Sequence, residues 1–83
     1  MTPKQVKQLT SALEQAFNAE VQAEKVSTKR YRFVVVSPQF CRMTQMERQD
    51  AIWAQVDQVL QKADAVNVSL ILAYAPNEIE QPA

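Results

Sequence analysis

Histidine and glycine are absent from this 83-residue sequence, and cysteine occurs once, as Cys41. Without histidine, the chain lacks the commonest general base and the commonest metal ligand. Without glycine, it has no phosphate-binding loop of the Walker, dinucleotide or GxxG type, because those loops need glycine where the backbone approaches the ligand. A single cysteine excludes an internal disulfide and a cysteine-cluster metal site. The nine acidic residues are scattered, with no paired carboxylates and no serine beside a base, so we do not expect an enzyme.

The sequence also lacks a net charge and a long apolar run. Nine basic and nine acidic side chains cancel, so no overall field attracts the protein to nucleic acid or to an anionic membrane. The longest apolar run, around residues 34–36, is far too short to span a bilayer. The first residues, MTPKQVKQ, lack the apolar core of a signal peptide. We therefore expect a single cytoplasmic domain over residues 1–83.

The first helix is predicted from a capping pattern and a helical spacing of apolar residues. Thr2 and Gln5 have the spacing of a capping box, with Pro3 at the first helical position. The expected buried stripe is Val6, Leu9, Leu13, Ala16 and Phe17. We expect this helix to end near Asn18, which tolerates a left-handed C-cap conformation.

A second and longer helix follows a connector at residues 39–43. Thr44 and Glu47 form its capping box, and residues 63–65 are expected to close it. Its expected buried stripe is Ile52, Val56, Val59, Leu60 and Ala63, with Arg48 on the opposite, polar face.

Three stretches have the composition of β-strands. Residues 20–26 mix charged and apolar side chains, as expected of an edge strand. Residues 30–36, RYRFVVV, are the richest in β-branched and aromatic residues, and their apolar end is expected to run into the core. In the last strand, residues 66–74, one face is expected to carry Val68, Leu70, Leu72 and Tyr74. The other face carries Asn67, Ser69, Ile71 and Ala73, and since Ile71 and Ala73 are also apolar, much of the strand is expected to be buried on both sides. A polar tail, residues 77–83, follows.

The order of these elements predicts the fold class. A helix between the second and third strands allows a parallel pair through a right-handed crossover, whereas the first two strands form a hairpin. We therefore predict an α+β, two-layer fold of order α-β-β-α-β, with a three-stranded mixed sheet and helices on one face.

This order and several residues resemble the BolA family, whose core is related to type II KH domains. The matching residues are Ala16-Phe17, Phe33, Val35-Val36-Ser37, Phe40, Thr44, Met46, Arg48 and Trp53, where the family usually has tyrosine. The spacing from Ser37 to Trp53 fits without a gap, and the resemblance covers nearly the whole chain. It implies a non-enzymatic regulatory module, associated with stress response, that binds a protein partner.

Three positions depart from the family at its functional residues. Arg42 replaces a glycine after the strand, and Gln49 stands where the family has a histidine next to arginine. Asn67 occupies the place of the histidine that ligates a [2Fe-2S] cluster shared with a monothiol glutaredoxin. The hairpin loop, residues 27–29, offers no second ligand. The resemblance thus implies a partner such as a monothiol glutaredoxin, but no iron ligand carries over, and we expect no cofactor held by this chain.

Cys41, Arg42, Arg48 and Asn67 are the candidate partner-binding residues. Cys41 is also a candidate redox thiol or cluster ligand, because the neighbouring Arg42 would favour its thiolate. As a cluster ligand it would need three further ligands from a partner or glutathione. The alternative is that Cys41 is only a small, semi-buried loop residue.

Arg48 has two interpretations of equal weight. It could bind a partner's carboxylate in bidentate fashion. Equally, it could pair with Glu47, Asp50 or the acidic tail of its own chain and hold the start of the helix in place.

The alternative function is nucleic-acid binding by a KH-like domain. The candidate phosphate contacts are Lys29, Arg30, Arg32 and Arg42, with Lys25 and Arg48 nearby. Tyr31 and Trp53 could stack bases if they were exposed. The missing GxxG loop and the zero net charge instead favour charges that only solvate a strand end and a helix start.

Overall fold

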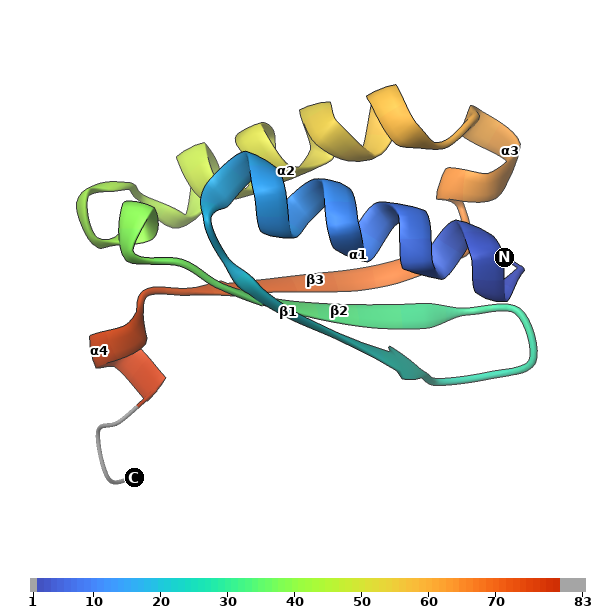
Figure 1. Ribbon diagram of the computed structural model, residues 1–83, viewed down its shortest axis with the longest axis horizontal. Coiled ribbons are helices and arrows are strands. Elements are labelled where there is room, and N and C mark those ends of the chain that lie inside the picture. The colour runs from blue at the N-terminus through green and yellow to red at the C-terminus, as the bar shows by residue number, and fades with distance from the viewer. Residues whose placement is uncertain (1, 80–83) are drawn as a thin grey trace.

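The structure, a computed structural model, describes residues 2–79 apart from the side chain of Ile79. Its elements are, in order, α1 (Pro3–Phe17), β1 (Glu20–Lys25), β2 (Tyr31–Val36), the 3₁₀ helix η1 (Pro38–Arg42), α2 (Gln45–Val59), α3 (Lys62–Ala65), β3 (Val68–Tyr74) and α4 (Pro76–Ile79). β1 pairs antiparallel with β2, and β2 pairs parallel with β3. Helices α1 and α2 lie side by side on one face of this sheet (Figure 1). The predicted α+β fold, with its mixed sheet and one-sided helices, is confirmed.

Both predicted capping boxes are present. At the start of α1, the hydroxyl of Thr2 accepts a hydrogen bond from the backbone N–H of Gln5, and the side chain of Gln5 accepts one from the backbone N–H of Thr2. Thr44 and Glu47 form the same pair of hydrogen bonds at the start of α2. Asn18 ends α1 in the left-handed conformation, with φ 49° and ψ 51°. These local signals act within four residues, which is why the sequence alone predicts them well.

The core lies between the helices and the sheet. Its buried apolar residues are Leu9, Leu13, Phe17, Phe33, Val35, Phe40, Ile52, Val56, Leu60, Val68, Ile71, Ala73 and Ala75. The rings of Phe17 and Phe40 pack with centroids 5.5 Å apart, joining α1 to η1. Among the described residues, no helix has both the length and the apolar character needed to cross a membrane.

Two alanines predicted in the buried stripes are exposed, and two short helices were not predicted. Ala16 lies beside the Leu9–Leu13–Phe17 line and faces solvent. Helix α2 ends at Val59, because Leu60 adopts an extended backbone as its C-cap; Ala63 therefore belongs to the separate turn α3 and is exposed. The expected polar tail begins instead with the helical turn α4, and its last four positions fall outside the described residues.

A β-bulge changes which side chains of β3 face the core. Tyr31 of β2 pairs with Val68, but the next residue, Arg32, pairs with Leu70, so that Ser69 is the additional residue. Beyond the bulge, Ile71 is 2% exposed whereas Leu70 is 47% exposed. The prediction that Leu70 shares the face of Val68 is therefore wrong, because simple alternation takes no account of the additional residue.

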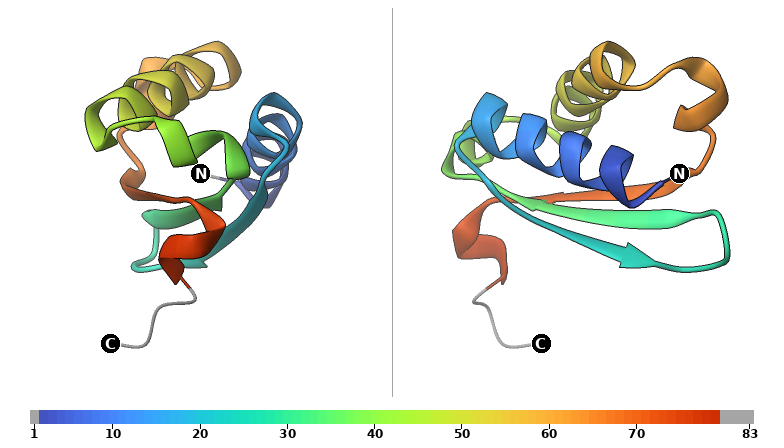
Figure 2. Two further views of the ribbon diagram at one scale, coloured as in Figure 1. Left: turned by 90° about the vertical axis from the view of Figure 1, so that its left-hand side faces the viewer. Right: turned by 45° about the vertical axis from the view of Figure 1, so that its right-hand side comes forward.

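The sheet has one covered face and one open face. Helices α1 and α2 cover the side of Phe33 and Val35, which are fully buried. Val34 and Val36 alternate with these residues and therefore point to the other face, where both are only half-buried. Neither α1 nor α2 lies on that face (Figure 2). The expectation that the apolar end of this strand runs into the core is thus correct for one face of β2 and wrong for the other.

Candidate functional site

Arg48 of α2 is buried, with 4% of its side chain exposed, and every guanidinium N–H has an acceptor. Nε donates to the carbonyl of Met43 at 3.1 Å, Nη1 to that of Ala73 at 3.1 Å, and Nη2 to that of Phe40 at 2.6 Å. The remaining two N–H groups bind the carboxylate of Glu78 at 2.8 and 3.0 Å. One side chain therefore joins η1, α2, β3 and α4.

The charges of Arg48 and Glu78 stabilise each other. Hydrogen bonds from Arg48, and a further one from the backbone N–H of Ala75 at 2.8 Å, lower the pKa of Glu78 from 4.5 to about 2. The bond to Glu78 in turn raises the pKa of Arg48. The guanidinium carbon also lies 5.7 Å from the ring centroid of Phe40, within the range of a cation–π contact.

The prediction that Arg48 lies on the solvent-exposed face of the helix is wrong. Arg48 precedes Ile52 by four residues, so helical spacing puts the two side chains on the same, buried face of α2. There the carbonyls of Phe40 in η1 and of its C-cap residue Met43 accept hydrogen bonds from the guanidinium. Of the two interpretations of Arg48, the structure shows the internal one, with Glu78 of the acidic tail as partner. No guanidinium N–H remains free for a carboxylate of another protein.

Polar side chains of α2 also cover the outer edge of β3. Gln45 Nε2 donates to the carbonyl of Ala73 at 3.1 Å, and Gln49 Nε2 donates to that of Ile71 at 2.9 Å. Since the carbonyl of Tyr74 points to β2, those of Ile71 and Ala73 point to the side of β3 that has no neighbouring strand. Gln49 therefore has a structural role at the position where the resemblance places a histidine.

Ser37 is fully buried at the junction of β2 and η1. Its Oγ donates to the carbonyl of Phe17 at 2.5 Å and accepts from the N–H of Gln39 at 3.1 Å. It thus ties the end of α1 to the start of η1, and η1 is held from both sides.

Around this buried network lies an exposed set of residues that we name the η1 surface: Cys41, Arg42, Met46 and Asn77. Cys41 is exposed, contrary to the semi-buried alternative, and its Sγ donates to Oδ1 of Asn77 at 3.6 Å. Met46, in the first turn of α2, is 75% exposed. These exposed side chains supply a thioether, a thiol and a guanidinium, a mixture of apolar and polar groups of the kind found in protein interfaces.

Asn67 does not belong to this surface. It precedes β3, where its carbonyl accepts the N–H of Tyr31 at 2.9 Å. Cys41 and Arg42 belong to η1, which follows β2, and because β2 and β3 are parallel, η1 lies at the end of the sheet where β3 finishes. Seven strand residues separate the two ends, or about 20 Å at ~3.3 Å per residue. The predicted partner-binding residues are therefore split between opposite ends of the molecule.

The donor atoms do not suit an iron–sulfur cluster. The amide of Asn67 is not among the usual cluster ligands, and Cys41, the one thiol, is too far away to replace it. Among the described residues, no group of three or more potential ligands could hold a metal ion.

The basic residues predicted to contact nucleic acid are also divided. Lys29 and Arg30 are exposed in the hairpin loop, and Arg32 forms an ion pair with Glu24. Arg42 lies in η1, which follows the last residue of β2, and therefore at the opposite end of the sheet from the hairpin loop. Tyr31 is half-buried against the core, so the ring proposed for base stacking is only partly accessible. No continuous basic surface results from these residues.

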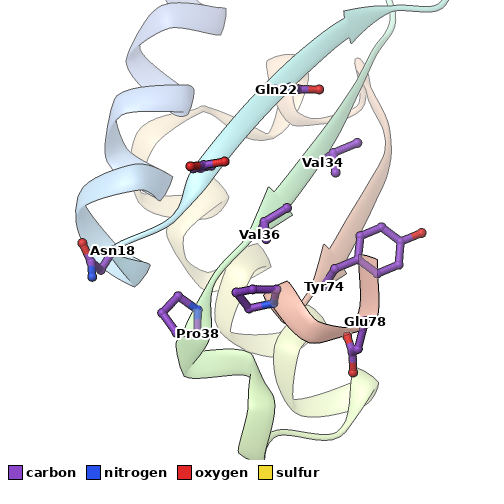
Figure 3. Close-up of a pocket in the computed structure, with 9 residues that line it drawn as sticks. Asn18, Gln22, Val34, Val36, Pro38, Tyr74 and Glu78 are labelled. Carbon is purple, nitrogen blue, oxygen red and sulfur yellow. The ribbon is translucent and has the colours of Figure 1, made fainter. Parts of the chain in front are cut away.

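Two features of the site were not predicted from the sequence. The first is the helical turn α4 that carries Glu78, although Pro76 at a first helical position, followed two residues later by glutamate, is a helix-start signal. The second is a hollow of about 860 Å³ on the open face of the sheet. Val34, Val36, Pro38 and Tyr74 line it (Figure 3). Pro76 is a further lining residue.

Comparisons with known proteins show the fold through structure and not through sequence. No protein-family model matches the chain, and no curated protein matches it in sequence. BolA1 from Arabidopsis thaliana is similar with a TM-score of 0.70 and 15% identity, covering 94% of this chain and 96% of that chain. The BolA domain of SufE1 from Arabidopsis thaliana has a TM-score of 0.69 and 18% identity, and the match covers 94% of this chain and 98% of that chain. A BolA protein homologue from Coxiella burnetii has a TM-score of 0.69 and 19% identity, and the match covers 98% of this chain and 99% of that chain. Over nearly its whole length, therefore, the chain has the BolA-like fold.

Proposed function

We propose that this chain is a non-enzymatic protein-interaction module that binds its partner through the η1 surface. The observation that carries the proposal is the complete internal use of Arg48, which fixes η1, α2 and α4 relative to one another. A surface that is already ordered loses little conformational entropy on binding. Exposed Met46 and Cys41 supply apolar contact area, and Arg42 supplies a charge for orientation.

The same contacts favour binding over catalysis. Cys41 donates to an amide oxygen, and Ser37 donates to a backbone carbonyl. Neither of these potential nucleophiles has a base beside it that would remove its proton.

The partner class that we propose is a monothiol glutaredoxin, because the BolA resemblance implies this partner. In such a complex, any [2Fe-2S] cluster would be held by ligands outside this chain. Binding would then depend on the protein surface alone.

Titration calorimetry with a monothiol glutaredoxin tests the proposal. We expect a complex that Arg42→Glu and Met46→Glu each weaken at least fivefold. Lys29→Glu is the matched control, since it reverses the same charge in the hairpin loop at the other end of the sheet, and Asn67→Ala is a second control there. The visible spectrum of the glutaredoxin's own cluster should not change when this chain binds. Absence of any complex, or equal weakening by Lys29→Glu and Arg42→Glu, would contradict the proposal.

A further inference from the structure

The open face of the sheet is more apolar than a surface in contact only with water needs to be. Strands β2 and β3 contribute Arg32, Val34, Val36, Leu70, Leu72 and Tyr74 to it. Strand β1 contributes the directly paired residues Glu20, Gln22 and Glu24. An apolar column thus lies beside a polar and acidic column, and Leu70 is 47% exposed. Contiguous exposed apolar area of this kind commonly marks an interaction site.

The apolar column is deepest near the end of β2. There the side chains of Val34, Val36 and Tyr74 line the hollow of about 860 Å³, and Pro76 and Glu78 of α4 line it on another side (Figure 3). This volume is in the range of ligand sites, which is ~300–1,000 Å³.

The charges that line the hollow select the chemistry of its occupant. Its lining includes two carboxylates, Glu20 and Glu78, and no lysine or arginine. Glu78 is paired with Arg48, whereas Glu20 takes part in neither of the two ion pairs formed within residues 2–79. A purely apolar occupant would remove water from Glu20 without replacing it, at a cost in free energy. A cationic group next to the apolar part of the occupant would compensate that cost.

We infer that the open face binds an amphipathic, basic segment of a partner protein. Its apolar side chains pack on Val34, Val36 and Tyr74, and a lysine or arginine lies against Glu20. This contact is separate from the η1 surface and does not depend on the glutaredoxin proposal.

The dimensions of the face argue against a second copy of this chain as the occupant. Three strands at ~4.8 Å spacing and six residues at ~3.3 Å give a face of about 300 Å². A stable interface needs about 800 Å² from each partner. In addition, Arg32, the one basic residue among the paired residues of this face, already has Glu24 as its partner. The open face of a second copy would therefore bring no free cation to Glu20. A single helix, ~10–12 Å across, matches the width of three strands.

The test is a ¹⁵N-NMR titration of the full chain with two synthetic 18-residue amphipathic helices, one of leucine and lysine and one of leucine and glutamate. We expect the lysine peptide to shift the amides of β2 and β3 around Val34, Val36 and Tyr74. Glu20→Lys should weaken this binding about fivefold, and Val36→Thr should also weaken it. Glu14→Lys is the matched control, because it makes the same charge change on an exposed position of α1.

Four results would overturn the inference. The first is that the lysine peptide does not bind at millimolar concentration, and the second is that the glutamate peptide binds with equal affinity. The third is that Glu14→Lys weakens binding as much as Glu20→Lys does. The fourth is that the chemical shifts change only in α1, α2 or η1. Self-association of the protein alone, with open-face shifts that grow with its concentration, would instead assign the face to a second copy and would also overturn it. Circular dichroism of each variant confirms that it is folded.

Discussion

Arg48 and Glu78 lie thirty residues apart in the sequence and form a bidentate ion pair whose two members differ in exposure. The side chain of Arg48 is 4% exposed and that of Glu78 is 39% exposed. Backbone carbonyls hold the guanidinium on its buried side, and the carboxylate covers it from the solvent side. The pair therefore attaches α4 to the start of α2, and the shape of the η1 surface depends on it.

Replacing Arg48 with alanine should destabilise the protein by about 3 kcal/mol. The variant removes the five hydrogen bonds that the guanidinium donates to three backbone carbonyls and to the carboxylate of Glu78. Arg48→Lys should recover less than half of the loss, because an ammonium has three donors and no planar fork. Urea denaturation measures both values. Arg42→Ala, an exposed neighbour, should stay within about 0.5 kcal/mol of the wild type; a loss equal to that of Arg48→Ala would refute the network.

The contribution of Glu78 to stability should disappear in acid. Its pKa is about 2 in the folded chain, compared with an ordinary value of 4.5. Because the folded state holds fewer protons between these values, the stabilisation is complete above about pH 4.5 and is lost as the pH falls toward 2. Glu78→Gln should therefore lower the melting temperature at pH 7 and have little effect near pH 2.

The comparison in acid must be made between Glu78→Gln and the wild type at each pH. Thr44 also lowers the pKa of Glu47, so the wild-type curve contains a second acid-sensitive contribution. Melting curves from pH 7 to pH 2 give the difference directly. If the difference in melting temperature between Glu78→Gln and the wild type were the same at pH 2 as at pH 7, Glu78 would act through packing and not through its charge.

Gln49→Ala should destabilise the chain by about 1–2 kcal/mol. The substitution removes the donor to the carbonyl of Ile71 and the acceptor of the Trp53 indole N–H. Tryptophan fluorescence should shift as the indole loses this partner, and urea denaturation gives the free energy. Gln58→Ala, at an exposed position of the same helix, is the control and should be neutral. Equal effects of the two substitutions would show that the edge contact adds nothing.

The predictions that succeeded rest on neighbours in the sequence. Capping boxes, the αL residue at Asn18 and the crossover between β2 and β3 need only local spacing and short connections. The fold class followed from their order. The BolA-like resemblance, stated from spaced residues such as Ser37 and Phe40, agrees with the structural comparisons.

The predictions that failed concern contacts between distant segments. The burial of Arg48 requires η1 to supply carbonyls and α4 to supply Glu78, and periodicity along one helix contains neither fact. The separation of Asn67 from Cys41 follows from the length of β3, which a list of candidate residues does not take into account. Candidate sites were therefore less predictable than the fold.

The bulge at Ser69 leads to a last prediction that separates the structure from simple alternation. Alternation from Val68 places Leu70 in the core, whereas the structure buries Ile71 and exposes Leu70. Ile71→Ala should therefore destabilise the chain by about 2–4 kcal/mol, and Leu70→Thr should change its stability by at most about 0.5 kcal/mol. Urea denaturation of the two variants distinguishes the registers. If Leu70→Thr lowered the free energy of unfolding more than Ile71→Ala, the bulge would be misplaced and Leu70 would belong to the core. The open face would then lose part of the apolar column on which peptide binding depends.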